Sequence, residues 1–245
     1  MVEKLNRHKI KNIEYYNKTA NTYNETHAFS RENRNHLKKI TQIIKLLDLK
    51  KGQKVLEVGV GSGIHAAKLM AAVPGIEFYG IDISKSMIKE TDKRLKNAGF
   101  KNFKLTVDDG ENLSFKENFF DAVYISGSLH HLSDPKQGVK EMTRVLKPGG
   151  KLAMMEPNKF FFKNYIMAKT IEIEKNVCQI TVKNFKKWSR ENNLKNVNIS
   201  YFIYTIPYPK FMFKIYDKID SFFEKVPLLK TMSIMIYMVG TKSKK

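Results

Sequence analysis

The stretch VLEVGVGSGIH, residues 55–65, decides the fold, because an apolar run is followed at once by three glycines on alternate positions. The apolar run is typical of a buried strand, and Gly59, Gly61 and Gly63 allow the backbone to turn sharply into a following helix. Such a turn also leaves room for a ligand to approach the backbone. The sequence therefore predicts a strand, a ligand-binding turn and a helix, in that order.

Short apolar segments alternate with helical patterns on both sides of this turn. Helices are predicted at about 35–48, 64–72, 84–98 and 136–147, the last of them stopped by Pro148 and two glycines. Further strands are predicted at EFYGIDIS, NFKLTVDD, FDAVYISG and GGKLAMMEP, which begin at residues 77, 102, 120 and 149. This alternation indicates an α/β fold with a parallel sheet covered on both faces and ligands at the carboxyl ends of its strands.

Two carboxylates narrow the choice of ligand. The turn departs from the GxGxxG pattern of dinucleotide sites, because its third glycine comes one residue early. Glu57, just before the turn, would repel a pyrophosphate but attract an amino group. Asp82 ends the second strand about 20 positions beyond the turn, where a carboxylate meets ribose hydroxyls. The pattern therefore favours a nucleoside that carries an amino-acid group.

Composition limits the class of protein. A chain of 245 residues, 42% of them apolar, can bury a full core, and we expect one domain over residues 1–245. The N-terminus has no apolar leader and no run of about 18 uncharged apolar residues occurs, so we expect a cytoplasmic protein. The single cysteine, Cys178, excludes an internal disulfide and a Cys-rich zinc site. The formal net charge of +20 suggests nucleic acid, but the lysines are spread out and arginine is scarce, which disfavours such a partner.

Five segments in order resemble the successive motifs of class I S-adenosylmethionine-dependent methyltransferases of the small-molecule type. They are VLEVGVGSG, YGIDIS, VDDGENLSF, FDAVYISGSLHHLSDP and RVLKPGGKLAMMEPN, and they span about residues 50–158. The resemblance implies a three-layer, doubly wound, mostly parallel seven-stranded sheet, the Rossmann-like methyltransferase fold, with an antiparallel last strand. It also implies S-adenosylmethionine as the cofactor and S-adenosylhomocysteine as its product.

The resemblance also divides the single domain into functional parts. These are an N-terminal lid helix region at 1–34, a cofactor-binding core at 35–156, substrate-covering insertions at 157–180 and 206–230, and a closing helix and strands at 181–205 and 231–245.

Roles for single residues follow from the same resemblance. Asp82 would accept hydrogen bonds from the ribose hydroxyls, Glu57 would lie near the cofactor's ammonium group, and the backbone carbonyl of Ser126 would bind that amino group. Asp109 would meet the adenine amino group, or Asp108 if the alignment slips by one residue. The other expected cofactor-binding residues are the turn glycines, residues beside the adenine and two aromatic residues of the lid, namely Gly59, Gly61, Gly63, Ile83, Met87, Gly110, Tyr16 and Tyr23. Plain core packing of Ile83 and Met87, and a structural stripe of tyrosines, are the alternatives.

Two histidines are candidates for the catalytic base. Methyl transfer needs an oriented acceptor and removal of a proton, and an imidazole titrates near neutrality. His130 and His131 follow the fourth strand in SGSLHHLSD, and the resemblance points to His131. Alternatively, both only cap or pack the loop. No metal site is expected, because no HExxH motif or carboxylate cluster is evident around them.

We therefore expect a methyltransferase that acts on oxygen or nitrogen of a small or lipid-linked acceptor. Base N-methylation is disfavoured, because strand four ends in ISGS and lacks the acid-Pro-Pro-aromatic signature of such enzymes. Two other hypotheses stay open, an RNA methyltransferase that uses the basic surface and a partner subunit that binds the cofactor without turnover. The sequence does not indicate an oligomeric state.

An amphipathic helix is predicted within residues 206–230. Lysines lie on its other faces, as Lys214, Lys218 and Lys225. The helix either packs its stripe on the domain or presents it to an anionic membrane surface, which would suit an acceptor with an apolar portion. The stripe is formed by Met212, Ile215, Ile219, Phe222 and Val226.

Overall fold

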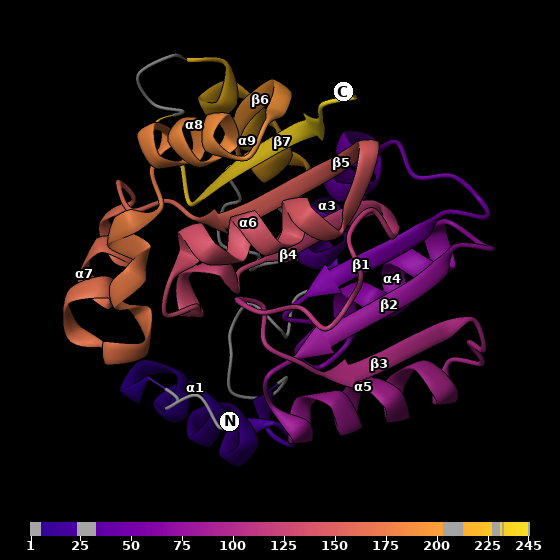
Figure 1. Cartoon of the computed structure of the whole chain (residues 1–245). Coiled ribbons are helices and arrows are strands. Elements are labelled where there is room, and N and C mark those ends of the chain that lie inside the picture. Colours follow the sequence, from indigo (N-terminus) through magenta and orange to yellow (C-terminus); the bar gives the residue numbers. More distant parts are fainter. Residues whose placement is uncertain (1–5, 24–32, 203–212, 227–230, 232, 245) are drawn as a thin grey trace.

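The computed structural model is built around one seven-stranded sheet with strand order β3-β2-β1-β4-β5-β7-β6. Strands β1 to β5 pair in parallel, and β7 pairs antiparallel with both β5 and β6 (Figure 1). The predicted sheet, with its antiparallel last strand, is confirmed. The strands are β1 Lys54–Val58, β2 Glu77–Asp82, β3 Phe103–Val107, β4 Phe120–Ser126, β5 Leu146–Pro157, β6 Leu194–Phe202 and β7 Met235–Lys242. The structure describes residues 6–23, 33–202, 213–226, 231 and 233–244.

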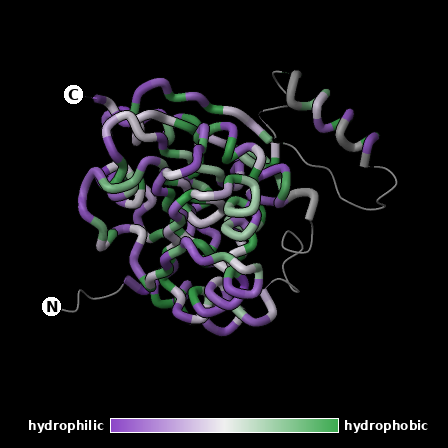
Figure 2. The backbone as a smooth tube through the Cα atoms, turned by 90° about the vertical axis from the view of Figure 1, so that its right-hand side faces the viewer, coloured by the Kyte–Doolittle hydropathy of each residue, from purple (hydrophilic) through white to green (hydrophobic). Residues whose placement is uncertain are grey.

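Helices cover both faces of the sheet, as the alternating pattern predicts. Apolar side chains of α3, α4 and α5 pack with one face, and those of α6 and α8 pack with the other. Hydrophobic segments accordingly lie at the centre of the molecule in Figure 2. The helices are α1 Arg7–Thr19, α3 Asn33–Leu47, α4 Ile64–Ala72, α5 Lys85–Asn97, α6 Pro135–Val145, α7 Phe162–Thr170, α8 Val182–Glu191 and α9 Phe213–Lys225, with 3-10 turns η1 Leu129–His131 and η2 Glu172–Gln179.

The central strands explain why the sheet forms where the sequence predicts it. Val55 and Leu56 of β1 face opposite sides and are both fully buried, as is Val123 of the neighbouring β4. A parallel strand buried on both faces must be apolar throughout, so it has no polar alternation. The carboxyl ends of these strands point toward α1 and α7 (Figure 1). Ligands of open α/β sheets bind at this edge.

The end of the predicted helix at 136–147 is wrong by two residues. Asp134 caps α6 by accepting from the backbone N–H groups of Lys136 and Gln137, and the helix ends at Val145. Leu146 already pairs with Phe120 in the sheet. Pro148 and the two glycines therefore lie within β5 and do not stop the helix.

The predicted C-terminal amphipathic helix is present as α9 but does not bury its apolar stripe. Ile215, Ile219 and Phe222 are 51%, 37% and 61% exposed, whereas Asp220 is buried and accepts a hydrogen bond from Lys38 at 3.0 Å. Met212 lies outside the described residues. In Figure 2, α9 lies at the margin of the molecule. Of the two alternatives for this stripe, the exposure of Ile215, Ile219 and Phe222 disfavours packing of these side chains on the domain.

Candidate active site

Two adjoining cavities open at the carboxyl ends of the strands. The β2-side cavity, about 90 Å³, is bounded by Asp82, Met87 and Asp109, and the β5-side cavity, about 230 Å³, by Glu57 and Ser126 among others. Both cavities share one set of wall residues, so they are two halves of one cleft. The shared residues are Tyr16, Tyr23, Gly59, Gly61, Gly127, Ser128 and His131.

The structure brings nearly all of the predicted site residues to this cleft. Gly63 lines neither cavity. It begins α4 with φ of 75°, and a Cβ there would come within 2.8 Å of Thr91, so it serves the packing of α4 against α5. The others line one or both cavities: Tyr16, Tyr23, Glu57, Gly59, Gly61, Asp82, Ile83, Met87, Asp109, Gly110, Ser126, His130 and His131.

The glycine turn and the end of β2 are tied together by Asp82. One carboxylate oxygen of Asp82 accepts from the backbone N–H of Gly61 at 2.9 Å, and the other accepts from that of Ser84 at 2.9 Å. Gly59 has φ of 71°, and a Cβ there would meet Ser128 at 2.5 Å, so only glycine fits. Burial raises the pKa of Asp82 to about 6, although these backbone donors lower it. The carboxylate is thus held rigidly at the wall of the β2-side cavity.

The far end of the β2-side cavity is acidic and is closed by α1. Lys9 of α1 donates to Asp109 at 2.6 Å and lies 3.1 Å from a carboxylate oxygen of Glu111. Asp108 accepts from both the backbone and the hydroxyl of Ser114, at 3.0 and 2.9 Å. Asp109 and Asp108 both line the cavity, so the structure leaves both alignments open.

The predicted N-terminal lid is anchored over the cleft at several points along α1. Asn17 accepts from the hydroxyl of Ser84 at 2.7 Å, and Asn12 donates to the backbone carbonyl of His131 at 3.3 Å. Together with the contact of Lys9 to Asp109, these contacts join α1 to the segments that follow β2, β3 and β4. The lid is therefore connected to both halves of the cleft.

Tyr16 and His131 form a hydrogen-bonded pair where the two cavities meet. The Tyr16 hydroxyl lies 2.7 Å from Nε2 of His131, and Nδ1 of His131 lies 3.1 Å from the carbonyl of Ile173. Because a carbonyl only accepts, Nδ1 carries the proton. Burial, and next the neighbouring His130, lower the pKa of His131 to about 3, so its ring is neutral. Nε2 therefore accepts a hydrogen bond from Tyr16.

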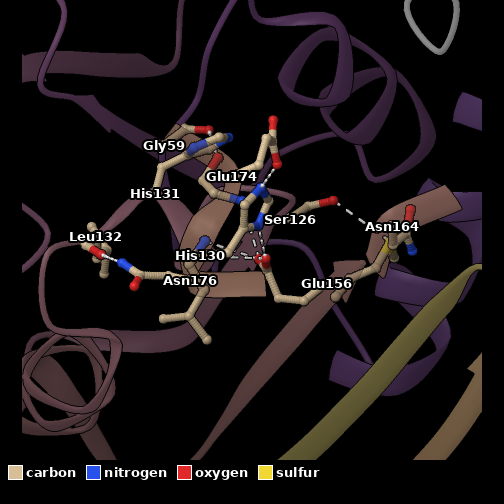
Figure 3. Close-up of polar contacts among 12 residues, drawn as sticks. Gly59, Ser126, His130, His131, Leu132, Glu156, Asn164, Glu174 and Asn176 are labelled. Atoms are coloured by element: carbon tan, nitrogen blue, oxygen red, sulfur yellow. Dashed lines mark hydrogen bonds and ion pairs between the residues drawn. The ribbon is translucent and has the colours of Figure 1, made fainter. Parts of the chain in front are cut away.

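His130 lies behind His131 and has a carboxylate on each ring nitrogen (Figure 3). Nδ1 is 2.6 Å from Glu156, at the end of β5, and Nε2 is 3.1 Å from Glu174 of η2. Burial lowers the pKa of His130, but Glu156 and Glu174 outweigh it and raise the pKa to about 9. His130 is thus a charged group fixed between two acids, and His131 is the neutral one of the two histidines, with a pKa well below the near-neutral value expected of a catalytic base.

Sequence reasoning missed the residues that surround the histidine pair. Glu156 stands in the quoted segment MMEPN at the end of a predicted strand, which is the signal that could have found it, whereas Glu174 comes from η2 and had no such signal. No metal was expected here. Among the described residues, His130, His131 and Glu174 offer ligand atoms that lie within 4.8 Å of one another. Carboxylates therefore do lie beside the histidine pair, although none was expected there from the sequence.

Comparison with protein families and curated proteins gives matches over the core of the chain. Residues 56–154 match the methyltransferase domain family. The demethylmenaquinone methyltransferase of Geobacillus sp. (strain WCH70) is 37% identical over 124 residues, which cover 50% of this chain and 53% of that protein. The demethylmenaquinone methyltransferase of Corynebacterium urealyticum is 40% identical over 110 residues, 45% and 44% of the two chains. The matches span about half the length of these relatives.

Solved structures match over nearly the whole chain. A possible histamine N-methyltransferase from Thermotoga maritima has a TM-score of 0.67 at 18% identity and covers 94% of this chain and 99% of its own. Phosphoethanolamine N-methyltransferase 2 of Haemonchus contortus, in complex with phosphomonomethylethanolamine and S-adenosylhomocysteine, has a TM-score of 0.65 at 16% identity and covers 96% of this chain and 59% of its own. At these identities the likeness shows the fold.

Proposed function

Residues 56–154 place the chain in the class I methyltransferase-domain family, and on that premise we propose that the protein is an S-adenosylmethionine-dependent methyltransferase. The observation that carries this proposal is the β2-side cavity. There a half-buried carboxylate, Asp82, is fixed to the turn at Gly61 and faces an apolar wall that includes Met87, with Asp109 beyond it. In a bound nucleoside, the ribose would match Asp82, the base would match the apolar wall, and the amino group of the base would match Asp109.

The cofactor supplies an activated methyl group on a sulfonium when it is bound. In the proposal, Asp82 accepts from the two ribose hydroxyls, and Ile83 and Met87 pack on the adenine. The carbonyl of Ser126 and the side chain of Glu57 bind the amino group from the β5-side cavity. Burial raises the pKa of Glu57 to about 8, and a bound ammonium group would stabilise its charged form.

Proton removal is assigned to Tyr16 and His131. The Tyr16 hydroxyl already donates to the neutral His131, so a Tyr16 lone pair is available to an acceptor that carries O–H or N–H. As the acceptor proton moves to the Tyr16 oxygen, the Tyr16 proton moves to Nε2 of His131. His130 and Glu156 position this pair and are not themselves the base.

The proposed acceptor is a small or lipid-linked molecule methylated on oxygen or nitrogen. Two observations support the lipid-linked character of the acceptor, namely the likeness to proteins named demethylmenaquinone methyltransferase and the exposed apolar surface of α7 and α9, and neither bears on the acceptor atom. The exposed apolar residues of α7 and α9 lie in the two predicted substrate-covering insertions and include Phe162, Tyr165, Phe222 and Phe223. We therefore extend the proposal to contact of the protein with a membrane surface that presents the acceptor.

The test measures S-adenosylhomocysteine formed by the purified chain. Demethylmenaquinone in its reduced form is the first acceptor offered, and a metabolite extract is the second. Product formation that requires both the acceptor and S-adenosylmethionine supports the proposal. Tight binding of S-adenosylhomocysteine without turnover on any acceptor would favour a cofactor-binding partner subunit instead.

A further inference from the structure

Lys39 of α3 is a buried cation without a partner of opposite charge at bonding distance. The residue is 8% exposed and lines the β5-side cavity. Within the described part of the chain, its ammonium nitrogen makes no hydrogen bond and no ion pair within 4.0 Å. A buried charge without compensation destabilises a fold, so the position needs an explanation.

The carboxylate that attracts Lys39 is already satisfied. Glu156 is fully buried, and its first oxygen accepts from the backbone N–H groups of Ser128 and Leu129 at 3.1 and 3.0 Å. Its second oxygen accepts from the backbone and the ring of His130, the ring at 2.6 Å. Glu156 thus accepts four hydrogen bonds, and its attraction for Lys39 is a longer-range electrostatic one without a hydrogen bond between the two side chains. The open side of the Lys39 ammonium is the cavity.

The other ionisable groups near Lys39 carry little negative charge. Burial, and next Lys39 itself, lower the pKa of His65, which is therefore neutral and shares a hydrogen bond of 3.0 Å with His36. Burial raises the pKa of Glu57 to about 8, and its carboxylate lies 3.9 Å from His65. Burial lowers the pKa of Lys39 to about 8 despite the attraction of Glu156, so it is still mostly charged at pH 7. This wall of the cavity is therefore electropositive.

We propose that Lys39 binds an anionic oxygen group, a carboxylate or a phosphate, of a molecule held in the β5-side cavity. The inference rests on the proposed function, because cofactor and acceptor meet in this cleft. In the proposed function the shared turn at Gly59 and Gly61 would hold the amino-acid end of the cofactor beside the same cavity, so the cofactor's carboxylate is one source of the anion. An anionic group on the acceptor is the other.

A ligand-binding role and a structural role of Lys39 predict opposite changes in stability. If Lys39 awaits an anion, Lys39→Met removes an unpaired buried charge and keeps the apolar stem, so the ligand-free variant should melt at the same or a higher temperature than wild type. If Lys39 stabilises the fold through Glu156, the variant should melt lower. The matched control is Lys45→Met, an exposed lysine on the same helix.

The first arm of the experiment tests the cofactor as the source. Calorimetry compares S-adenosylhomocysteine, which carries the carboxylate, with 5′-methylthioadenosine, which lacks the amino-acid group. If the cofactor supplies the anion, Lys39→Met should bind S-adenosylhomocysteine about 10- to 100-fold more weakly and 5′-methylthioadenosine as tightly as wild type does. Lys39→Arg should recover part of the loss, and Lys45→Met should lose nothing.

The second arm tests the acceptor as the source. Wild type and Lys39→Met are saturated with S-adenosylhomocysteine, and their melting temperatures are followed as inorganic phosphate is added, with sodium chloride at equal ionic strength as the control. If the acceptor supplies the anion, phosphate should raise the melting temperature of wild type alone, while both proteins bind the cofactor product equally. Either response supports the proposal, and the arm that responds identifies the source.

The proposal is overturned if Lys39→Met binds S-adenosylhomocysteine as tightly as wild type does and is stabilised by phosphate to the same extent. It is also overturned if the variant melts at a lower temperature and its affinities for S-adenosylhomocysteine and 5′-methylthioadenosine change by the same factor. Failure of the proposed function has a different signature. In that case wild type itself would bind neither S-adenosylhomocysteine nor 5′-methylthioadenosine, whatever residue stands at position 39.

Discussion

Asp82 is the side chain on which cofactor binding depends most. Replacing it with alanine removes charge-assisted hydrogen bonds to the ribose and also frees the backbone N–H of Gly61, which it holds at 2.9 Å. Asp82→Ala should therefore weaken S-adenosylhomocysteine binding by about 1.5–3 kcal/mol, measured by calorimetry. Asp92→Ala is the control, because this residue of α5 lines neither cavity of the cleft. Wild-type affinity in Asp82→Ala would remove Asp82 from the ribose site.

Tyr16 and His131 should act as one unit in turnover. His131→Ala is expected to lower kcat by about 10² or more, the usual contribution of a general base, while leaving cofactor affinity nearly unchanged. Because the acceptor proton passes through the Tyr16 hydroxyl, Tyr16→Phe should cost a similar factor, and the double variant should lose little more than either single one. Fully multiplicative losses, or retained turnover of His131→Ala across pH 6 to 9, would contradict the shared role.

The pair of His130 and Glu174 should make stability depend on pH. Burial lowers the pKa of His130 but the two carboxylates raise it to about 9, above the ordinary value of 6.5. Its stabilising contribution is therefore complete below about pH 6.5 and is lost as the pH rises through about 9. Glu174→Gln should melt below wild type at pH 6.5, and the difference should shrink by pH 9.5. A difference that stays constant over this range would show that His130 is not the titrating partner.

The individual site residues divide into those with a sequence signal and those without one. Asp82 and the turn at Gly59 and Gly61 could be predicted because local spacing fixes where a strand ends and a helix begins. Lys39 and Glu174 could not be, because their place at the cleft depends on how α3 and η2 pack against the sheet. Long-range packing of this kind leaves no local pattern in the sequence.

Helix α1 is the element whose movement should control access to the cofactor. One of its attachments over the β2-side cavity is Lys9, which bonds to Asp109 and lies beside Glu111. Lys9→Met should therefore speed amide hydrogen exchange in residues 7–19 of the ligand-free protein and speed release of S-adenosylhomocysteine. Lys18→Met, an exposed lysine on the same helix, is the control.

If α1 exchanges equally in the three proteins, Lys9 does not hold the lid. Wild-type exchange in this helix should also slow when S-adenosylhomocysteine is added, because the ligand fills the cavity that α1 covers. An unchanged exchange rate would argue that the lid does not respond to the cofactor.

Elements of the core were predicted more accurately than those at its margins. The strand at β1 and the helices α4 and α5 fall where the sequence predicts them, because β1 is an apolar run buried on both faces and each helix buries one side against the sheet. The end of α6 was misplaced, since Leu146 gains more by pairing with Phe120 in the sheet than by continuing the helix before Pro148. The pairing partner lies 26 residues away in sequence, so local signals could not reveal it.

For the molecule as a whole, a mostly parallel seven-stranded sheet with an antiparallel last strand was expected from the family resemblance, and periodicity alone predicted only a parallel α/β sheet. A second feature of the whole molecule, the exposure of large apolar side chains, was not fixed by the sequence. Part of the described chain, around α7 and α9, leaves large apolar side chains in solvent, with Phe162 at 74% and Phe222 at 61% exposure. The structure describes no helix that is both long and apolar enough to cross a bilayer. Exposed apolar side chains of this size are typical of surfaces that contact a partner.

A negatively charged lipid surface suits both the apolar side chains and the lysines of α9. Phe222 and Phe223 are exposed beside exposed lysines, and the chain carries a formal net charge of +20. Wild type should co-sediment with anionic vesicles at physiological salt more than with neutral ones. The double variant Phe222→Asp, Phe223→Asp should reduce the bound fraction about tenfold or more, because it removes two apolar anchors and adds two repelled charges.

Charge and apolar contact are separated by a matched pair of single variants. Phe222→Asp and Ser221→Asp add the same charge at neighbouring exposed positions of α9, but only Phe222→Asp removes an aromatic ring. If the ring enters the interface, Phe222→Asp should bind vesicles clearly less than Ser221→Asp does. Equal loss in the two variants would reduce the contact to electrostatic attraction. Equal recovery of wild type in the supernatant with and without anionic vesicles would exclude the membrane surface and leave an apolar cover for a soluble acceptor.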